Sequence, residues 1–456
     1  MDATTKQLVD FALQSEFSAL SAPTVHACKV RLIDTFGCAI GAYDETLSRS
    51  ARAIARHYAK TPGVSVWGSR MKTVPEAAAF ANGVMLRYLD LSDTYVGKCR
   101  GHPSDTIAGV LAVADSIGAD GPAVINAVVL AYDVYCSLVD AVDFNGKGWD
   151  QPVYGVLAGV LAAGKLMNLS AQQMGDAVAL ALVPNMALAQ TRRGELSTWK
   201  GCAGANAARN SVFAALLARE GFTGPPAVFE GKGGLWDIVG RFDIPLPEKN
   251  APHLLPQTHL KSLPICYHGQ SAVLAALELR KRVSVDAVRE IQVDTYDIAV
   301  MMMGADAGRW APATRETADH SLPYCIAIAL LDGEITAHSF TPQRLQDPAV
   351  KKLMGLTKVN ADPELCAQYP ESVPGRVRIT TASGEALTAE VRYPTGHAMN
   401  PISDADVEKK FRGMFAGRAN AADCEQLLKS LWALEQVRDI GREILALPAL
   451  SGAADD

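Results

Sequence analysis

The chain has 456 residues, 49% of them hydrophobic and 20% charged, which is a globular composition with enough length for two domains. Its formal net charge is -6, and no run of Lys or Arg with interleaved aromatic residues occurs, which argues against nucleic acid as a partner. No stretch of about 18 uninterrupted apolar residues occurs either, so we expect no membrane span.

The N-terminal segment MDATTKQLVDFALQ has neither a basic region before an apolar core nor an Arg-rich pattern, so we expect a cytoplasmic protein. The nine cysteines are scattered without a C-x-x-C pair, which predicts reduced thiols, mostly in the core. Iron–sulfur ligation usually needs clustered cysteines, so this spacing also argues against a cluster enzyme.

Helices dominate the first 265 residues. Ser21 precedes an apolar run through Phe36, and the segment 73–76 (TVPE) reads as a capping box that opens a helix over 77–89. Further helices are predicted over 107–117, 123–139, 153–167, 170–182 and 205–220. Ala-rich helices that are apolar on every side indicate the interior of a large helical domain.

The pattern changes near residue 265. Alternating residues over 289–300, 376–381 and 386–393 predict strands, the last two forming a hairpin, and 323–331 predicts an apolar helix. Helices return from Ser403, and residues 451–456 read as a frayed tail. The prediction is a mostly α fold, with a large all-helical domain over 1–265 and 400–456 and a smaller α+β lid domain over 266–399.

The segment richest in reactive side chains runs from Tyr88 to Asp105. A helix ends there in two carboxylates and a threonine, and a loop then presents His102. Loops at helix ends commonly carry catalysis, and Asp90, Thr94 and His102 are the candidates here. The alternative interpretation is a polar helix end followed by a helix cap at Ser104.

Four further segments carry candidate residues at helix or strand ends, namely Lys200, Lys261 with His268, His320 with Tyr324, and His397. Lys200 precedes a helix start rich in small residues, where a cation and free backbone N–H groups can hold a carboxylate. Taken singly, each segment also fits a structural role, as a solvated lysine, a linker histidine, an N-cap or a turn.

Motifs for metals and cofactors are missing from the sequence. The nine histidines form no H-x-x-x-H or H-E-x-x-H pattern, and no G-x-S-x-G elbow occurs. The glycines of 231–234 lack the spacing of a phosphate-binding loop. We therefore expect no metal and no cofactor.

Taken together and in order, the five segments resemble the MmgE/PrpD family along nearly the whole chain. The resemblance implies a helical domain built from both ends of the chain, an α+β lid and a homodimer. It also implies a cofactor-independent lyase that acts on a small polycarboxylate, most like the 2-methylcitrate dehydratases of propionate catabolism. Alternatives are a cis-aconitate decarboxylase, an iminodisuccinate epimerase or an inactive scaffold protein.

The resemblance also implies roles for particular residues. It places the family's catalytic aspartate, threonine, histidine and tyrosine on Asp90, Thr94, His102 and Tyr324, with His320 beside the tyrosine as a further candidate. The expected substrate-binding residues are Lys200, Lys261, His268, Asp150 and His397. Many members have a histidine where this chain has Asp150, which makes decarboxylation the less favoured activity.

Loss of water from a hydroxy-polycarboxylate needs a base for a C–H bond, an acid for the hydroxyl group and cations for the carboxylates. Asp90 or His102 can supply the base, and Tyr324 or His102 the acid. Lys200 and Lys261 can supply the cations, in a cleft between the two domains. We expect either lysine-to-methionine substitution to lower kcat/KM sharply and to leave the melting temperature nearly unchanged.

Overall fold

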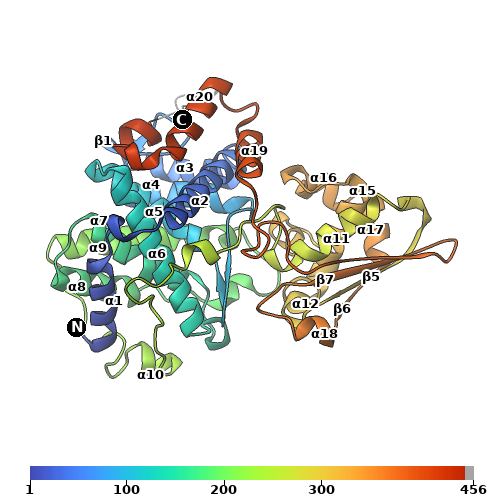
Figure 1. The fold of residues 1–456 in the computed structure, drawn as a ribbon, viewed down its shortest axis with the longest axis horizontal. Helices are drawn as coiled ribbons and strands as arrows, with labels where there is room; N and C mark the ends of the chain where they lie inside the picture. Colours follow the sequence, from blue (N-terminus) through green and yellow to red (C-terminus); the bar gives the residue numbers. More distant parts are fainter. Residues whose placement is uncertain (447–456) are drawn as a thin grey trace.

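The computed structural model describes residues 1–446, and the tail expected over 451–456 lies outside the described residues. The main hydrophobic core draws residues from Leu8 to Leu260 and again from Val407 to Leu445. A second core lies within 263–379. We call residues 1–262 with 404–446 the helical part, and 263–403 the α+β part (Figure 1). The mostly α prediction is confirmed, and the division into two domains stays a prediction.

The helical part contains α1 (Ala3–Gln14), α2 (Ala22–Gly41), α3 (Thr46–Arg56), α4 (Pro75–Tyr88), α5 (Ile107–Ile117), α6 (Gly121–Ala141), α7 (Pro152–Leu166), α8 (Ala171–Leu182), α9 (Trp199–Arg219), α10 (Leu235–Val239), α19 (Asp404–Phe415) and α20 (Ala421–Trp432). Two short ribbons join them, β1 (Ala59–Ser65) with β2 (Lys72–Thr73), and β3 (Tyr95–Val96) with β4 (Arg100–Gly101). Ser21 and Ser170 cap α2 and α8, because each side chain accepts a hydrogen bond from a backbone N–H three residues later.

The capping box predicted over 73–76 is wrong, although its helix is present. α4 begins at Pro75 after Val74, and no side chain caps it. Thr73 instead belongs to β2, and its hydroxyl donates to the carbonyl oxygens of Ala55 and Tyr58 at 2.9 and 3.0 Å. The hydroxyl thus satisfies carbonyls at the end of α3, where otherwise orphaned acceptors lie.

Helices α4 and α9 pack unusually closely because Gly83 faces Ala205. A Cβ atom on Gly83 would lie 2.8 Å from the Cβ of Ala205, which is closer than side chains tolerate. The two helices are therefore held together at a position that admits only glycine. Their contact brings the segment after α4, with Asp90, close to the first turn of α9, with Lys200.

Helix α6 is long and apolar enough to cross a membrane by length and composition alone. However, 89% of its most apolar window is buried, against α2, α5 and α7 among others. This burial is typical of the central helix of a folded core.

The C-terminal helices return to the helical part, where α19 lies beside α2 (Figure 1). The rings of His26 and Trp432 stack with centroids 5.3 Å apart, and the Lys29 ammonium lies 3.0 Å from Glu435. These contacts join residues about 400 positions apart in the chain.

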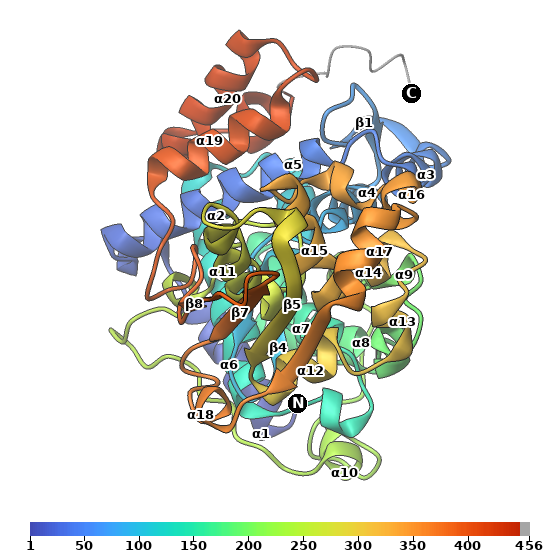
Figure 2. The ribbon, with the colours of Figure 1, turned by 90° about the vertical axis from the view of Figure 1, so that its right-hand side faces the viewer.

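The α+β part contains α11 (Gln270–Arg280), β5 (Val288–Thr295), α12 (Asp297–Met303), α13 (Ala307–Trp310), α14 (Arg315–Ala318), α15 (Leu322–Asp332), α16 (Pro342–Leu345), α17 (Pro348–Gly355), β6 (Thr357–Ala361), α18 (Pro363–Cys366), β7 (Gly375–Thr381) and β8 (Ala386–Val391). The sheet order is β6-β5-β7-β8, with β6 parallel to β5 and the other pairs antiparallel. α11 packs against β7 and β8 (Figure 2).

The predicted hairpin is confirmed as β7 and β8, but the strand predicted over 289–300 is too long. β5 ends at Thr295, and the next residues form α12. The apolar residues that follow Thr295 were read as continued alternation, but they belong to a helix. That helix positions Ile298, Met301 and Met302 in the wall of a cavity.

Hydrogen bonds hold in place the segment that leads from the helical part into the α+β part. Thr94 and His259 exchange backbone hydrogen bonds of 2.8 and 2.7 Å, and the N–H of Leu260 donates to the carbonyl oxygen of Gly396 at 2.9 Å. Lys410 of α19 donates to the carbonyl oxygen of Lys261 at 3.0 Å. The segment around Lys261 is thereby held against both ends of the helical part.

Candidate active site

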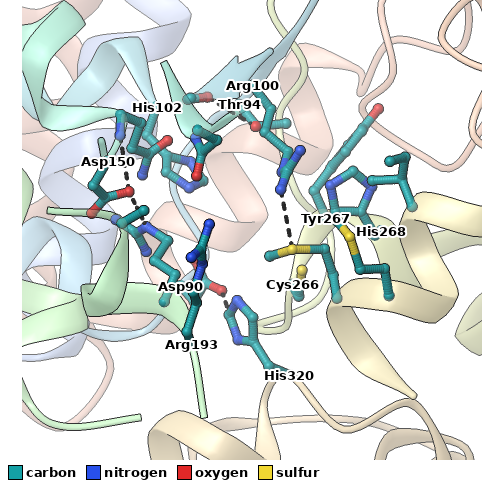
Figure 3. A pocket seen from close by; sticks show the side chains of 18 of the residues that line it. Asp90, Thr94, Arg100, His102, Asp150, Arg193, Cys266, Tyr267, His268 and His320 are labelled. Carbon is teal, nitrogen blue, oxygen red and sulfur yellow. Dashed lines mark hydrogen bonds and ion pairs between the residues drawn. The ribbon is translucent and has the colours of Figure 1, made fainter. Parts of the chain in front are cut away.

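A cavity of about 620 Å³ lies between the helical part and the α+β part, within the size range of small-molecule sites. Residues from both parts line it (Figure 3). Its charged side chains are five basic residues (Arg100, Arg192, Arg193, Lys261 and Arg309) and four acidic residues (Asp90, Asp143, Asp150 and Asp306). The cleft position expected from the sequence therefore corresponds to a physical cavity.

Asp90 occupies a strained position just after α4. Its φ angle is 50°, which is uncommon for a residue other than glycine and costs on the order of 1–3 kcal/mol. The Lys261 ammonium offsets this cost, because it donates to the carbonyl oxygen of Asp90 at 2.9 Å and to its Oδ1 at 3.0 Å. Arg87, one turn earlier, also donates to Oδ1. The backbone strain thus points the carboxylate into a set of cations.

The Asp90 carboxylate is ionised despite being buried. Burial alone would raise its pKa, but the charges of Arg87 and of the lysines at 200 and 261 outweigh burial and hold the pKa well below its usual value. The Lys200 ammonium lies 3.5 Å from Oδ2 of Asp90. A carboxylate with so little affinity for a proton is better suited to orienting cations than to removing a proton.

His102 is held in one tautomer by its two ring contacts. Nδ1 lies 2.7 Å from the carbonyl oxygen of Asp93, which can only accept, so Nδ1 carries the proton. Nε2 lies 2.7 Å from a guanidinium nitrogen of Arg87 and accepts from it. Burial lowers the pKa of His102 well below its usual value, and the charges of Arg87 and Lys261 lower it further. His102 is therefore a neutral imidazole with its lone pair on Nε2.

The environment of His320 shifts its pKa in the opposite direction. Its Nδ1 lies 2.5 Å from Oδ1 of Asp319, whose carboxylate also accepts from the Lys200 ammonium at 3.0 and 3.2 Å. Burial and Lys200 lower the pKa of His320, but Cys266 and Asp319 outweigh them, so the pKa is raised. Figure 3 shows His320 reaching toward Asp90 from the α+β side.

The Cys266 thiol belongs to the same cluster. Its backbone N–H donates to the carbonyl oxygen of Asp319 at 2.9 Å. Burial would raise the pKa of this thiol, but the charge of His320 and a hydrogen bond to it lower the pKa. The thiol and the imidazole thus each stabilise the ionised form of the other.

Seven of the ten residues predicted for the site line the cavity, namely Asp90, Thr94, His102, Asp150, Lys261, His268 and His320. Asp150 is fully buried and its Oδ1 accepts from Nε of Arg192 at 2.7 Å. The Thr94 hydroxyl donates to the carbonyl oxygen of Gly101 at 2.9 Å.

Three predicted residues, Lys200, Tyr324 and His397, are not among the cavity-lining residues of the described chain. Lys200 lies within the first turn of α9 and contacts the cavity residue Asp90. The buried Tyr324 hydroxyl donates to the carbonyl oxygen of Ser339 at 2.6 Å. His397 stacks on His259, with ring centroids 4.2 Å apart.

The arginines around the cavity had no role in the predictions made from the sequence. Arg192 and Arg193 stand within the segment that supplied Lys200, and Arg100 stands in the loop before His102, so their positions were visible. Arg309 had no motif around it. Only the folded chain brings it to the cavity wall.

Asp90, Asp319 and His320 place three potential metal-ligand atoms within 4.8 Å of one another. Protein cations already contact the two carboxylates, since Lys261 and Lys200 donate to them. A divalent ion there would meet these ammonium groups at close range. The arrangement fits an internal ion network better than a metal site.

Fold and cavity together define a class, a mostly helical protein that holds a cavity lined by five basic side chains against an α+β part. The chain belongs to the MmgE/PrpD family: the model of the MmgE/PrpD N-terminal domain matches residues 6–243, and that of the C-terminal domain matches 263–435.

Curated relatives are similar along most of their length. A 2-methylcitrate dehydratase of Cupriavidus necator is 27% identical over 96% of this chain and 94% of its own length. One from Escherichia coli K12 is 28% identical over 87% and 86%. A mitochondrial 2-methylcitrate dehydratase of Yarrowia lipolytica is 24% identical over 94% and 86%.

Proposed function

We propose that this protein is a hydro-lyase that removes water from a small hydroxy-polycarboxylate, with 2-methylcitrate as the first candidate substrate. The observation that carries the proposal is the pair of histidines in one cation-rich cavity. The environment of His102 lowers its pKa, and that of His320 raises its pKa. Two titratable groups whose pKa values are shifted in opposite directions are suited to act as base and acid.

His102 is suited to act as the base. It is neutral, and within residues 1–446 its Nε2 lone pair has only the Arg87 N–H as a partner. A bound polycarboxylate brings negative charge that offsets Arg87 and Lys261, so it raises the proton affinity of Nε2 when the substrate is in place. Nε2 then accepts the proton from the substrate carbon next to a carboxylate, once the Arg87 N–H turns from Nε2 to a substrate carboxylate and frees the lone pair.

His320 is suited to act as the acid. The Asp319 carboxylate on its Nδ1 favours the imidazolium. The imidazolium can donate a proton to the departing hydroxyl group, which then leaves as water. Asp319 keeps the ring oriented, and Lys200 in turn holds Asp319.

The cations support binding of the substrate carboxylates and of the enolate-like charge that develops as the C–H bond breaks. Lys261 lines the cavity directly. Lys200 lies behind Asp90, so we propose that it positions Asp90 and Asp319. We propose that Thr94, Asp150 and His268 contact the substrate from the wall, and that Tyr324 and His397 support the site from outside the cavity.

We also propose that the protein is a cytoplasmic homodimer that needs no metal or cofactor. Light scattering of the purified chain tests the dimer. Prolonged treatment with a chelator tests the metal, because full loss of turnover with rescue by one metal ion contradicts the proposal.

The substrate is tested with a panel of 2-methylcitrate, citrate, cis-aconitate and iminodisuccinate. Ultraviolet absorbance detects a new alkene, and NMR in deuterated water detects exchange of a carbon-bound proton. We expect alkene formation from a hydroxy acid. Release of carbon dioxide from cis-aconitate, or exchange without net loss of water, contradicts the dehydratase proposal in favour of a decarboxylase or an epimerase. No change with any acid contradicts an enzymatic role on this class.

A further inference from the structure

One cavity residue, Arg309, lacks a partner in the described chain. The segment 305–310 is exposed except for Arg309, whose side chain turns inward and is 2% exposed. Its Nε and Nη1 atoms are buried and make no hydrogen bond, and no ion pair involves its guanidinium within residues 1–446. Arginine does not discharge at any accessible pH, so this residue is a buried positive charge that no carboxylate of the described chain pairs with directly, although Cys266, Asp306 and Asp319 attract it from longer range.

The position of Arg309 is fixed relative to the proposed acid. The Ser321 hydroxyl donates to the carbonyl oxygen of Arg309, and Ser321 is the N-cap of α15. Ser321 directly follows His320, so Arg309 and the imidazole are held by the same short segment. Arg309, Cys266 and His320 all line the cavity.

Part of the wall of this cavity is apolar. α12 contributes Ile298, Met301 and Met302 to the same cavity, just before α13. An apolar wall excludes water and strengthens a charge-assisted hydrogen bond within it. Asp306 also faces the cavity but forms no ion pair with Arg309 in the described chain.

We propose that Arg309 is a carboxylate subsite, which receives one carboxylate of the polycarboxylate from the α+β side while Lys261 and the arginines of the helical part receive the others. The proposal rests on the proposed function for the identity of the ligand. A guanidinium offers two parallel N–H donors, which matches the two oxygens of a carboxylate. The ligand carboxylate thereby forms the ion pair that no described side chain forms with Arg309, and the ligand links the two parts of the fold.

The test uses tricarballylate, which has three carboxylates and no hydroxyl group and therefore cannot lose water. Isothermal titration calorimetry measures its Kd for the wild-type chain and for Arg309→Met, Arg309→Lys and Arg315→Met. Arg315 is the matched control, because its guanidinium lies over the rings of Tyr88 and Phe340 and is not among the cavity-lining residues. We expect Arg309→Met to weaken binding on the order of tenfold or more, Arg309→Lys to weaken it less, and Arg315→Met to leave it unchanged.

Thermal melting without ligand gives a second readout. Arg309→Met removes a buried charge that makes no ion pair in the described chain. Its melting temperature should therefore be equal to or above that of the wild type. A lower melting temperature with an unchanged Kd shows that Arg309 pairs within the protein and overturns the proposal. An equal loss of affinity in Arg315→Met overturns it as well.

The two proposals fail in different ways. If tricarballylate binds through Arg309 but no hydroxy acid is turned over, the subsite stands and the dehydratase proposal fails. If the wild type dehydrates a hydroxy acid and Arg309→Met keeps its affinity for tricarballylate, the dehydratase proposal stands and the subsite fails.

Discussion

Replacement of Lys200 by methionine should destabilise the protein as well as slow it. The ammonium lies 3.0 and 3.2 Å from the oxygens of Asp319 and 3.5 Å from Asp90, and the lysine side chain is only 4% exposed. Asp90 keeps Arg87 and Lys261 in the variant, whereas Asp319 keeps only His320 among the ion-pair partners of the described chain. Removing one partner of a buried ion pair costs about 3–5 kcal/mol, so we expect a loss of about 3 kcal/mol.

This expectation reverses the one made from the sequence, in which a lysine variant left the melting temperature nearly unchanged. A solvated lysine would behave in that way. Lys200 is instead buried in the ion network, so its removal leaves a carboxylate partly uncompensated.

A double-mutant cycle with Asp319→Asn measures the coupling. The free energy of unfolding comes from urea titrations of Lys200→Met, Asp319→Asn and the double variant, with Lys165→Met as a control. Lys165 is a partly exposed lysine in α7, outside the cavity, whose ammonium donates one hydrogen bond to the carbonyl oxygen of Leu13 at 2.8 Å, so its loss should cost only about 1 kcal/mol. We expect the double variant to lose about 0.5–3 kcal/mol less unfolding free energy than the two single variants lose together. Additive single effects would refute the ion pair as the cause.

Three further predictions concern the acid, the tyrosine and the helix contact. Asp319→Asn removes a group that raises the pKa of His320, so the alkaline limb of kcat/KM, where the imidazolium loses its proton, should move to lower pH; an unmoved limb in the pH–rate profile excludes His320 as the acid. Tyr324→Phe should cost about 1 kcal/mol in urea unfolding, because its hydroxyl bonds a backbone carbonyl, and should leave KM unchanged; a large rise in KM would instead place the hydroxyl on the substrate. Gly83→Ala should lower stability by about 1–3 kcal/mol, because the new Cβ meets Ala205, and a melting temperature equal to the wild type would show that α4 and α9 can separate at no cost.

Local features of the fold were predictable because they depend on neighbouring residues. The cap at Ser21 and the hairpin of 376–391 each need only a few adjacent side chains. β6 was not predicted, because an edge strand with mostly exposed residues carries no alternating apolar pattern. The capping box at 73–76 failed because Thr73 has partners that are distant in the sequence.

The site was predictable in its residue types and not in its contacts. The segments that hold Asp90, His102 and His320 stood out because reactive side chains stand at the boundaries of predicted helices there. Nothing in the sequence indicated that Lys200 is buried against Asp319, which is 119 positions away. Arg309 was invisible for a related reason, because its burial depends on how α13 packs against α15.

The most direct test of the central claim is the rate at which 2-methylcitrate loses water with the wild type and with His102→Gln, followed by proton NMR. The account predicts alkene formation by the wild type. It predicts a rate lower by about 10²–10⁴ in the variant, because general-base catalysis contributes about that much. Circular dichroism of the variant should match the wild type. A His102→Gln rate within tenfold of the wild type, or a correctly folded wild type that forms no alkene, would contradict the account.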